Sequence, residues 1–240
     1  MLAHKSTRSQ MIQPRPTKLR ISSMHYKLSS GIEIRTENAA KPESQPSKFL
    51  LHLIGNLSHV GSSFDYGCGK LRYQKAISDR TDTLAIIDSE IQLSRSQRLR
   101  GKETTIRGVF KQSNRIEVYN DVEFQHLAVQ FERGFCINVL SVIPSYARRR
   151  QVLDLIRKKL ASNGECLFVV QYRNSDFSRM SKMPNAKPWL DGFLMDSLRG
   201  YSFYGMISPD RLARSLERAG FRMREITLNE GSAYAWARRN

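Results

Sequence analysis

The sequence is short of cysteine and of long apolar runs. Its three cysteines, Cys68, Cys136 and Cys166, are widely spaced and form no Cys-x-x-Cys pair, which argues against a zinc ribbon and against a disulfide scaffold. Each stands in an apolar context, so we expect three buried thiols and a reducing cytoplasm. No run approaches the ~18 to 20 apolar residues of a membrane span. No apolar stretch follows the basic N-terminus, so neither a membrane partner nor a secretory signal is expected.

Acidic residues are also scarce. The 22 Asp and Glu stand against 39 Lys and Arg, which gives a formal net charge of +17 in 240 residues. An excess of this size favours a nucleic acid or another polyanion as partner, the alternative being a solvated surface that only maintains solubility. Residues 1–27 contain no acid, and a second basic cluster lies between residues 148 and 159. The cluster consists of Arg148, Arg149, Arg150, Arg157, Lys158 and Lys159.

Composition divides the chain into two parts. Residues 1–30 are basic and polar with almost no apolar face, so we expect a poorly ordered arm up to about residue 27. Residues 31–240 are long enough for one domain with a real core, and their first part, 31–47, reads as a short strand and a proline-bearing linker.

The rest of the chain alternates apolar strands with amphipathic helices. Helices are predicted at residues 47–57, 71–78, 89–101, 121–130, 145–164 and 208–221. Core strands are predicted at 62–67, 83–88, 115–120, 134–143 and 165–172, and REITLN and SAYAWARR close the chain as a strand pair. A strand at 104–110 competes with 115–120 for the third core position, and we prefer 115–120. This order predicts an α/β fold with a mostly parallel sheet, helices on both faces and right-handed crossovers.

The stretch FDYGCGKLRY, residues 64–73, carries an acid and two closely spaced glycines after the first core strand. Ligands of such sheets bind beyond the carboxyl ends of the strands. Gly67 and Gly69 remove side chains where a nucleoside would press on the backbone, although they could also form a simple turn. Asp88, at the end of the second strand, can accept both hydroxyls of a ribose or merely cap the next helix. A dinucleotide pattern would need glycine at position 72, which is Arg72.

These motifs resemble those of the class I S-adenosylmethionine-dependent methyltransferases. The resemblance covers about residues 47–240 and rests on the acid-x-Gly-x-Gly loop, on the acid of LAIIDSE, on VYNDV after the third strand, on INVLSVI and on the Asn-Gly turn of LASNGECLFVV. It implies a Rossmann-like sheet that ends in an antiparallel strand pair, and S-adenosylmethionine as cofactor. It further implies a cofactor site, with no metal, made of Asp65, Gly67, Gly69, Asp88, Asp121 and Asn138. Asp121 would lie beside the adenine, or cap a helix, and Asn138 would contact cofactor or acceptor.

The chain departs from the family in two ways. Many members carry a third glycine where this chain has Leu71, which leaves less room beside the methionine end of the cofactor. The Asp/Asn-Pro-Pro-aromatic motif and the Pro-Cys nucleophile of two DNA methyltransferase classes are both absent, and NVLS stands after the fourth strand. The resemblance therefore identifies no catalytic residue.

Residues 173–209 form a long connection rich in aromatic and basic residues, and long loops in compact domains are usually functional. We interpret it as a lid or acceptor insertion, with Tyr172, Arg173 and Tyr204 as acceptor contacts, against the alternative of a packing lid. Two functions remain open at this point. One is an active methyltransferase on an unidentified acceptor, nucleic acid being favoured by charge. The other is a catalytically inactive methyltransferase-fold protein that acts as a nucleic-acid-binding or interaction module.

Overall fold

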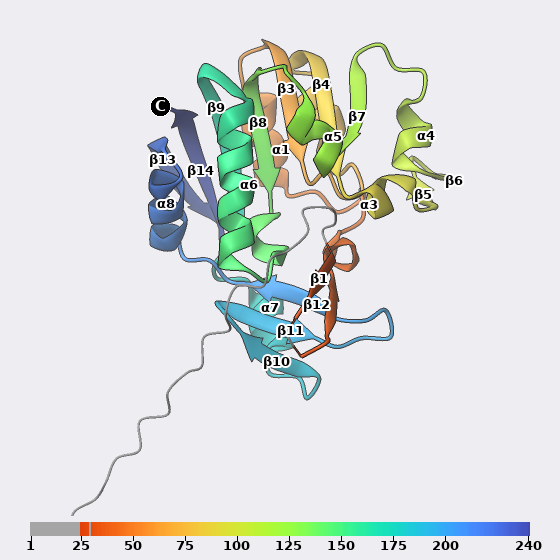
Figure 1. The fold of residues 1–240 in the computed structure, drawn as a ribbon, viewed down its shortest axis with the longest axis vertical. Coiled ribbons are helices and arrows are strands. Elements are labelled where there is room, and N and C mark those ends of the chain that lie inside the picture. The colour runs from red at the N-terminus through yellow and green to blue at the C-terminus, as the bar shows by residue number, and fades with distance from the viewer. Residues whose placement is uncertain (1–24, 29) are drawn as a thin grey trace, which may run out of the picture.

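The computed structural model describes residues 25–28 and 30–240 (Figure 1). Residues 1–24 and 29, which include most of the predicted arm, lie outside the described residues. The last part of that arm differs from expectation, because strand β1 (His25–Lys27) pairs antiparallel with β2 (Glu33–Arg35). A 3-10 helix, η1 (Thr36–Ala39), follows β2 directly.

A seven-stranded sheet forms the centre of the molecule. Its strands are β3 (Val60–Tyr66), β4 (Thr81–Asp88), β7 (Ile116–Asn120), β8 (Phe131–Ile137), β9 (Leu160–Gln171), β13 (Phe221–Asn229) and β14 (Ser232–Arg239). Their order across the sheet is β13-β14-β9-β8-β3-β4-β7, with β9 to β7 parallel and β14 antiparallel to both of its neighbours. The predicted fold class, including the C-terminal antiparallel pair, is confirmed.

Helices cover both faces of this sheet and bury two separate apolar clusters (Figure 1). One face carries α5 (Asp121–His126), α6 (Tyr146–Lys159) and α8 (Pro209–Arg218). The other face carries α1 (Lys48–Gly55), α2 (Gln74–Ser78), α3 (Glu90–Ser94) and α4 (Ile106–Phe110). None of the helices in the described part of the chain is long and apolar enough to cross a membrane.

A second, three-stranded sheet lies beyond the C-terminal ends of the parallel strands, whereas the chain's C-terminus lies at the opposite end (Figure 1). It consists of β10 (Ala186–Trp189), β11 (Gly192–Met195) and β12 (Ser202–Gly205), all antiparallel. The segment 173–209 is therefore mostly structured, since it also contains α7 (Ser175–Met180). A bridge between Ile34 and Tyr201 joins this sheet to the N-terminal β1–β2 pair.

A buried ion pair fixes the second sheet to the main body. Arg149 of α6 donates to both carboxylate oxygens of Asp191, at 2.6 and 2.8 Å, and their side chains are only 8% and 5% exposed. Arg149 also donates to the carbonyl of Ile143. Because Asp191 lies in the turn between β10 and β11, this pair sets the position of the whole second sheet.

Two predicted elements between residues 89 and 110 are wrong. The helix predicted at 89–101 ends at Ser94, and a hairpin of β5 (Gln97–Leu99) and β6 (Lys102–Thr104) follows it. Arg100 and Gly101 both adopt positive φ, which is the geometry of a tight hairpin turn rather than of a helix end. The competing strand at 104–110 is the short helix α4, which begins where the Thr105 hydroxyl accepts from the amide of Gly108.

Two boundaries around β8 and β9 also differ. The strand predicted at 134–143 ends at Ile137, because Asn138 has a φ of 61° and a 3-10 helix, η2 (Leu140–Val142), follows. The helix predicted at 145–164 ends at Lys159, and β9 begins at Leu160. The Asn-Gly pair therefore lies within the strand, where Asn163 has a φ of 65°.

Asp191→Ala should lower the free energy of unfolding by about 3 to 5 kcal/mol, because it leaves the buried guanidinium of Arg149 without its charge partner. Asp154→Ala is the matched control, since Asp154 pairs with the neighbouring Arg150 at 48% and 39% side-chain exposure. That surface pair should contribute only about 0.2 to 1 kcal/mol. Urea unfolding monitored by circular dichroism measures both, and equal losses would contradict the role given to Asp191.

Candidate functional site

The glycine loop after β3 is fastened to the end of β4. The amides of Gly67 and Cys68 both donate to the carbonyl of Ile87, at 2.7 and 3.0 Å. Gly67 has a φ of 80°, and a Cβ there would lie 2.3 Å from a methyl group of Val139. Glycine is therefore required at position 67 by both backbone conformation and space.

Asp88 holds this loop in place from the other side. One oxygen of its carboxylate accepts from the amide of Gly69 at 2.9 Å, and the other accepts from the amide of Ser89 at 2.8 Å. The thiol of Cys68 lies 3.8 Å from the same carboxylate. Asp88 thus connects the glycine loop to the start of α3, and Gly67, Gly69 and Asp88 are brought together as the sequence predicts.

Leu71 continues the loop in an unusual conformation. Its φ is 62°, in the left-handed region that costs most residues about 1 to 2 kcal/mol. The side chain is 2% exposed and packs in the apolar cluster below α1 and α2. Burial of leucine therefore offsets the backbone strain at a position where many class I methyltransferases have glycine.

Asp65 and Asp88 place two buried carboxyl groups on neighbouring strands. Burial, followed by the charge of Asp88, raises the pKa of Asp65 to about 7. Burial also raises the pKa of Asp88 to about 6, opposed by its two backbone hydrogen bonds. No hydrogen bond of the Asp65 side chain is found within residues 25–28 and 30–240, so this carboxyl group is available to a ligand.

Gln92 of α3 is a site residue that the sequence reading missed. Its side-chain amide donates to the carbonyl of Gly69 and to the side chain of Gln97. Its own oxygen Oε1 is buried and has no hydrogen-bond partner in the part of the chain described here. Gln92 stands four residues after Asp88, one helical turn along, which is the signal that could have identified it.

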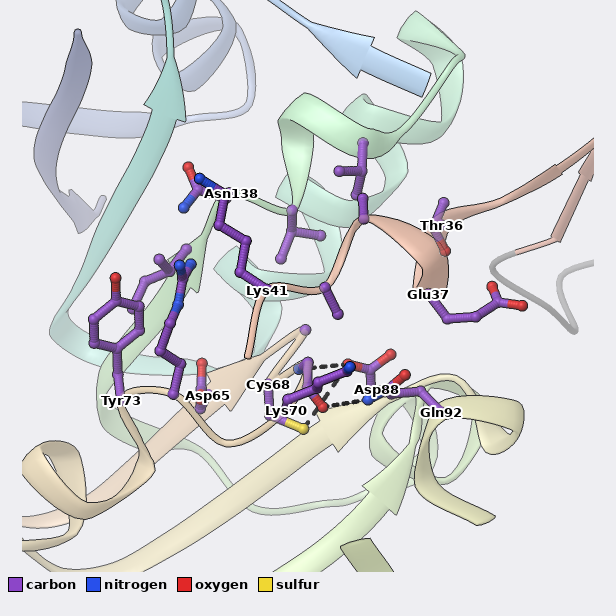
Figure 2. A pocket seen from close by; sticks show the side chains of 18 residues that line it. Thr36, Glu37, Lys41, Asp65, Cys68, Lys70, Tyr73, Asp88, Gln92 and Asn138 are labelled. Carbon is purple, nitrogen blue, oxygen red and sulfur yellow. Dashed lines mark hydrogen bonds between the residues drawn. The ribbon is translucent and has the colours of Figure 1, made fainter. Parts of the chain in front are cut away.

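These residues line a cavity of about 110 Å³ at the C-terminal ends of β3 and β4 (Figure 2). Asp65, Gly67, Gly69, Asp88, Gln92 and Asn138 all belong to its wall. Across the cavity from Asp88 and Gln92 lies η1 (Figure 2), which continues to Ala40 and Lys41. We call residues 36–41 the strap. It lies in the segment 31–47, which the sequence indicates to be a short strand and a linker, so the strap was not expected at the site.

A second cavity of about 260 Å³ adjoins the first. The two share six wall residues, Ala39, Lys41, Arg72, Tyr73, Asn138 and Val142. Asn138 therefore lies at their junction. The side chain of Gln171 donates to Asn138 Oδ1 at 2.9 Å and to the hydroxyl of Ser232 at 2.9 Å. This arrangement leaves the amide nitrogen of Asn138 available as a donor at the junction.

Aromatic rings form one side of the second cavity. Tyr204 of β12 packs edge-on against Phe177, with ring centroids 5.1 Å apart, and stacks on Phe193 at 5.5 Å. Phe177 and Tyr204 belong to the cavity wall, whereas Tyr172 and Arg173 do not. Of the three proposed acceptor contacts, only Tyr204 is thus brought to the site.

Asp121 is not brought to either of these cavities. It pairs with Arg148 at 3.3 Å and lines a different cavity with Tyr66 and α6. Asn120 caps α5 by accepting from the amides of Val122 and Glu123. Asp121, the first residue of α5, faces Arg148 of α6 and not the glycine loop. Among the described residues, no group of three or more metal-binding side chains is found.

The three consecutive arginines of the predicted basic cluster are all neutralised. Arg148 pairs with Asp121, Arg149 with Asp191 and Arg150 with Asp154. The Arg148 and Arg149 pairs join different elements of the fold, the Arg150 pair lies on the surface of α6, and the three together offer little free charge to a polyanion.

The comparison with curated proteins identifies one relative over nearly its whole length. The uncharacterized protein YmfD of Escherichia coli K12 is 30% identical over 218 residues, which span 89% of this chain and 96% of YmfD. The chain belongs to the YmfD family. No known family model matches the chain.

Solved structures show the same fold at low sequence identity. The N-methyltransferase NodS of Bradyrhizobium japonicum WM9, in complex with S-adenosyl-L-homocysteine, has a TM-score of 0.52 at 14% identity and covers 80% of this chain and 84% of its own. DhpI in its SAM-HEP complex has a TM-score of 0.55 at 15% identity, over 78% and 83% of the two chains. A SAM-dependent methyltransferase of Methanosarcina mazei has a TM-score of 0.52 at 12% identity, over 81% and 99%. The chain has the class I methyltransferase fold, as the resemblance in the sequence predicts.

Asp65→Asn should make stability less sensitive to pH. A carboxyl group whose pKa is raised on folding stabilises the protein fully below about pH 4, and that stability is lost as the pH rises to about 7. The free energy of unfolding of the variant should therefore equal that of the native protein near pH 4. At pH 8 it should be higher by roughly 1 to 4 kcal/mol. Thermal unfolding from pH 4 to 8 measures this, with the surface variant Asp154→Asn as control. If the difference in stability between Asp65→Asn and the native protein stayed the same from pH 4 to pH 8, the raised pKa of Asp65 would be contradicted.

Proposed function

We propose that the protein is an S-adenosylmethionine-dependent methyltransferase that acts on an acceptor group held in the second cavity. The observation that carries this proposal is the cavity at the ends of β3 and β4, walled by the glycine loop and Asp88 and continuous with a second cavity at Asn138. NodS and DhpI, which share the fold, were crystallised with S-adenosylhomocysteine and S-adenosylmethionine, respectively.

The chemistry of the first cavity fits this cofactor. S-adenosylmethionine presents donors: an ammonium group, two ribose hydroxyls and an adenine amino group. The wall offers acceptors, namely the carboxylates of Asp65 and Asp88 and the Oε1 of Gln92, which has no hydrogen-bond partner among residues 25–28 and 30–240. Asp88 would hold the ribose, Asp65 the ammonium group and Gln92 an amino or hydroxyl group. Because buried acceptors without donors cost free energy, a donor-rich ligand satisfies this wall.

The reaction asks for positioning more than for acid or base chemistry. When bound, the cofactor supplies a methyl group on a sulfonium centre. Asn138, at the junction of the cavities, would hold the acceptor by donating to it, and Gln171 fixes the orientation of Asn138. Such orientation accounts for a large share of rate enhancement in transfer reactions.

The second cavity suits a planar acceptor group. Phe177, Tyr204 and Tyr234 contribute aromatic surface, and Lys41 and Arg72 contribute positive charge. A ring of a small molecule fits this description, and so does one base turned out of a nucleic acid, since both are read by stacking and by polar contacts at their edges.

One observation favours the alternative, a catalytically inactive member of the fold that serves as a nucleic-acid-binding or interaction module. The first cavity measures about 110 Å³, whereas pockets for drug-sized ligands usually measure about 300 to 1,000 Å³. A cofactor held wholly within the first cavity would therefore require the strap to move outward. A strap that stays closed would leave a protein with the fold and without the activity.

We also propose a reducing compartment, the cytoplasm, as the place of action. Cys68, Cys136 and Cys166 are all buried and unpaired with one another. Burial raises the pKa of each thiol, so these groups stay protonated and unreactive.

Asp88→Ala should weaken binding of S-adenosylmethionine by about 1.5 to 3 kcal/mol, because it removes a charged acceptor for the ribose. Isothermal titration calorimetry measures the change. Asp88→Asn is a second variant, since it keeps an acceptor for the amide of Gly69 and so separates loop collapse from lost ribose contact. Asp121→Asn is the control and should bind as the native protein does, because Asp121 lies in another cavity. Absence of any binding by the native protein would favour the inactive alternative.

A further inference from the structure

A row of charged side chains crosses four neighbouring strands at the end of the sheet opposite the two cavities. Arg133 of β8 stands opposite Glu165 of β9, Glu165 stands opposite Arg238 of β14, and Arg238 stands opposite Arg222 of β13. Residues in register across neighbouring strands point to the same face, at a spacing of about 4.8 Å per strand. The row therefore extends roughly 14 Å across the sheet.

A fifth charge joins the row through a β-bulge. The register of β13 and β14 shifts between Met223 and Glu225, which leaves Arg224 as the extra residue. Bulges re-aim side chains, and Arg224 donates to Glu165 at 2.7 Å. We call Arg133, Arg222, Arg224 and Arg238 around Glu165 the arginine row.

The single carboxylate of the row is already occupied. Arg133 donates to Glu165 Oε1 at 3.1 and 3.3 Å, and Arg224 pairs with Oε2. No ion pair of Arg222 or Arg238 is found within the described residues. The Nε of Arg238 is buried and lacks a hydrogen-bond partner there. Residues 1–24 contain no acid that could complete the set.

This arrangement has an energetic cost for the isolated protein. Arg222 and Arg238 are like charges directly opposite each other on neighbouring strands, which is destabilising. Arg148, Arg149 and Arg150, by contrast, are each matched with an aspartate. A bound anion would relieve the repulsion between Arg222 and Arg238.

We propose that the arginine row binds the phosphodiester backbone of a nucleic acid through Arg222, Arg224 and Arg238, which are exposed or half-buried. Arg133 is buried and donates to Ser58 and Glu165, so it only holds Glu165 in place. Guanidinium groups recognise phosphate oxygens with two parallel hydrogen bonds, and a linear array of them matches a linear polyanion. The net charge of +17 supplies the long-range attraction. The proposed contacts are to phosphate oxygens, which carry no sequence information, so we expect binding with little dependence on sequence. It also lies at the other end of β8 and β9 from Asn138 and Gln171, so it acts separately from the proposed transfer site.

The test is fluorescence anisotropy with a labelled 20-nucleotide single-stranded DNA, an RNA of the same sequence and the corresponding 20-base-pair duplex, between 50 and 300 mM salt. The native protein should bind with affinity that falls linearly in log salt. Arg222→Gln with Arg238→Gln should reduce the slope by about 1.4 to 1.8 and weaken binding about 25- to 60-fold at 100 mM salt, since each phosphate contact contributes about 0.7 to 0.9 to the slope.

The matched control is Arg98→Gln with Lys102→Gln, which removes two exposed charges from the β5–β6 hairpin. This control should retain most of the affinity and slope. Arg222→Lys with Arg238→Lys keeps the charges, and it should retain the slope and lose part of the affinity, which tests the proposal if the glutamine variant fails to fold. Calorimetry with S-adenosylmethionine should give the same result for all variants, so failure here is distinguishable from failure of the proposed function.

Several results would overturn the proposal. Equal losses in the row variant and its control would mean that only net charge matters. No binding by the native protein at 50 mM salt would end the proposal outright, as would binding to phosphatidylserine vesicles but to none of the three nucleic acids. Aggregation of the row variant with unchanged nucleic-acid binding would instead identify the arginines as protection of the edge strand β13.

Discussion

The carboxylate of Asp88 is the interaction on which the site depends. It accepts from the amide of Gly69 in the glycine loop and from the amide of Ser89, the N-cap of α3, so it joins the loop to the start of the helix. A carboxylate that accepts two backbone hydrogen bonds in a buried place has little freedom to move. Gly69 and Gln92, which are hydrogen-bonded to each other, form one side of the first cavity, and Asp88 fixes their position.

The positions of the glycine loop and Asp88 could be predicted from sequence, because they depend only on the order of the strands. Gly67, Gly69 and Asp88 follow consecutive parallel strands, and topology alone brings such strand ends together. Three other features could not be predicted this way. Asp121, the first residue of α5, faces Arg148 of α6 and not the glycine loop. The turn at Arg100 and Gly101 reads equally well as a helix end. The strap is distant in sequence from the other residues of the site, so no hydrophobic periodicity or motif spacing predicts that it lies there.

The arginines of this protein fall into two groups that composition cannot distinguish. Some, such as Arg149, are buried and matched with a carboxylate, and they contribute to the fold. Others, such as Arg222 and Arg238, lie where the fold gains nothing from their charge. A net charge of +17 counts both groups alike. Cross-strand register and the ion pairs together separate them, because Glu165, which stands opposite Arg238, already pairs with Arg133 and Arg224.

The position of the strap affects how ligands enter and leave the two cavities. It is tied at one end, where the amide of Arg35 donates to the carbonyl of Tyr201, and at the other where Ser47 begins α1. Between these points Asn38 donates to the carbonyl of Arg199 and Arg95 donates to the carbonyl of Glu37, so an outward movement of the strap would break these bonds too. Ala39 and Lys41 contribute to the walls of both cavities, so one displacement unroofs both. Ligands of the two cavities would then enter and leave through the same opening. A substitution at Ala39 or Lys41 would therefore change the dissociation rate of both ligands.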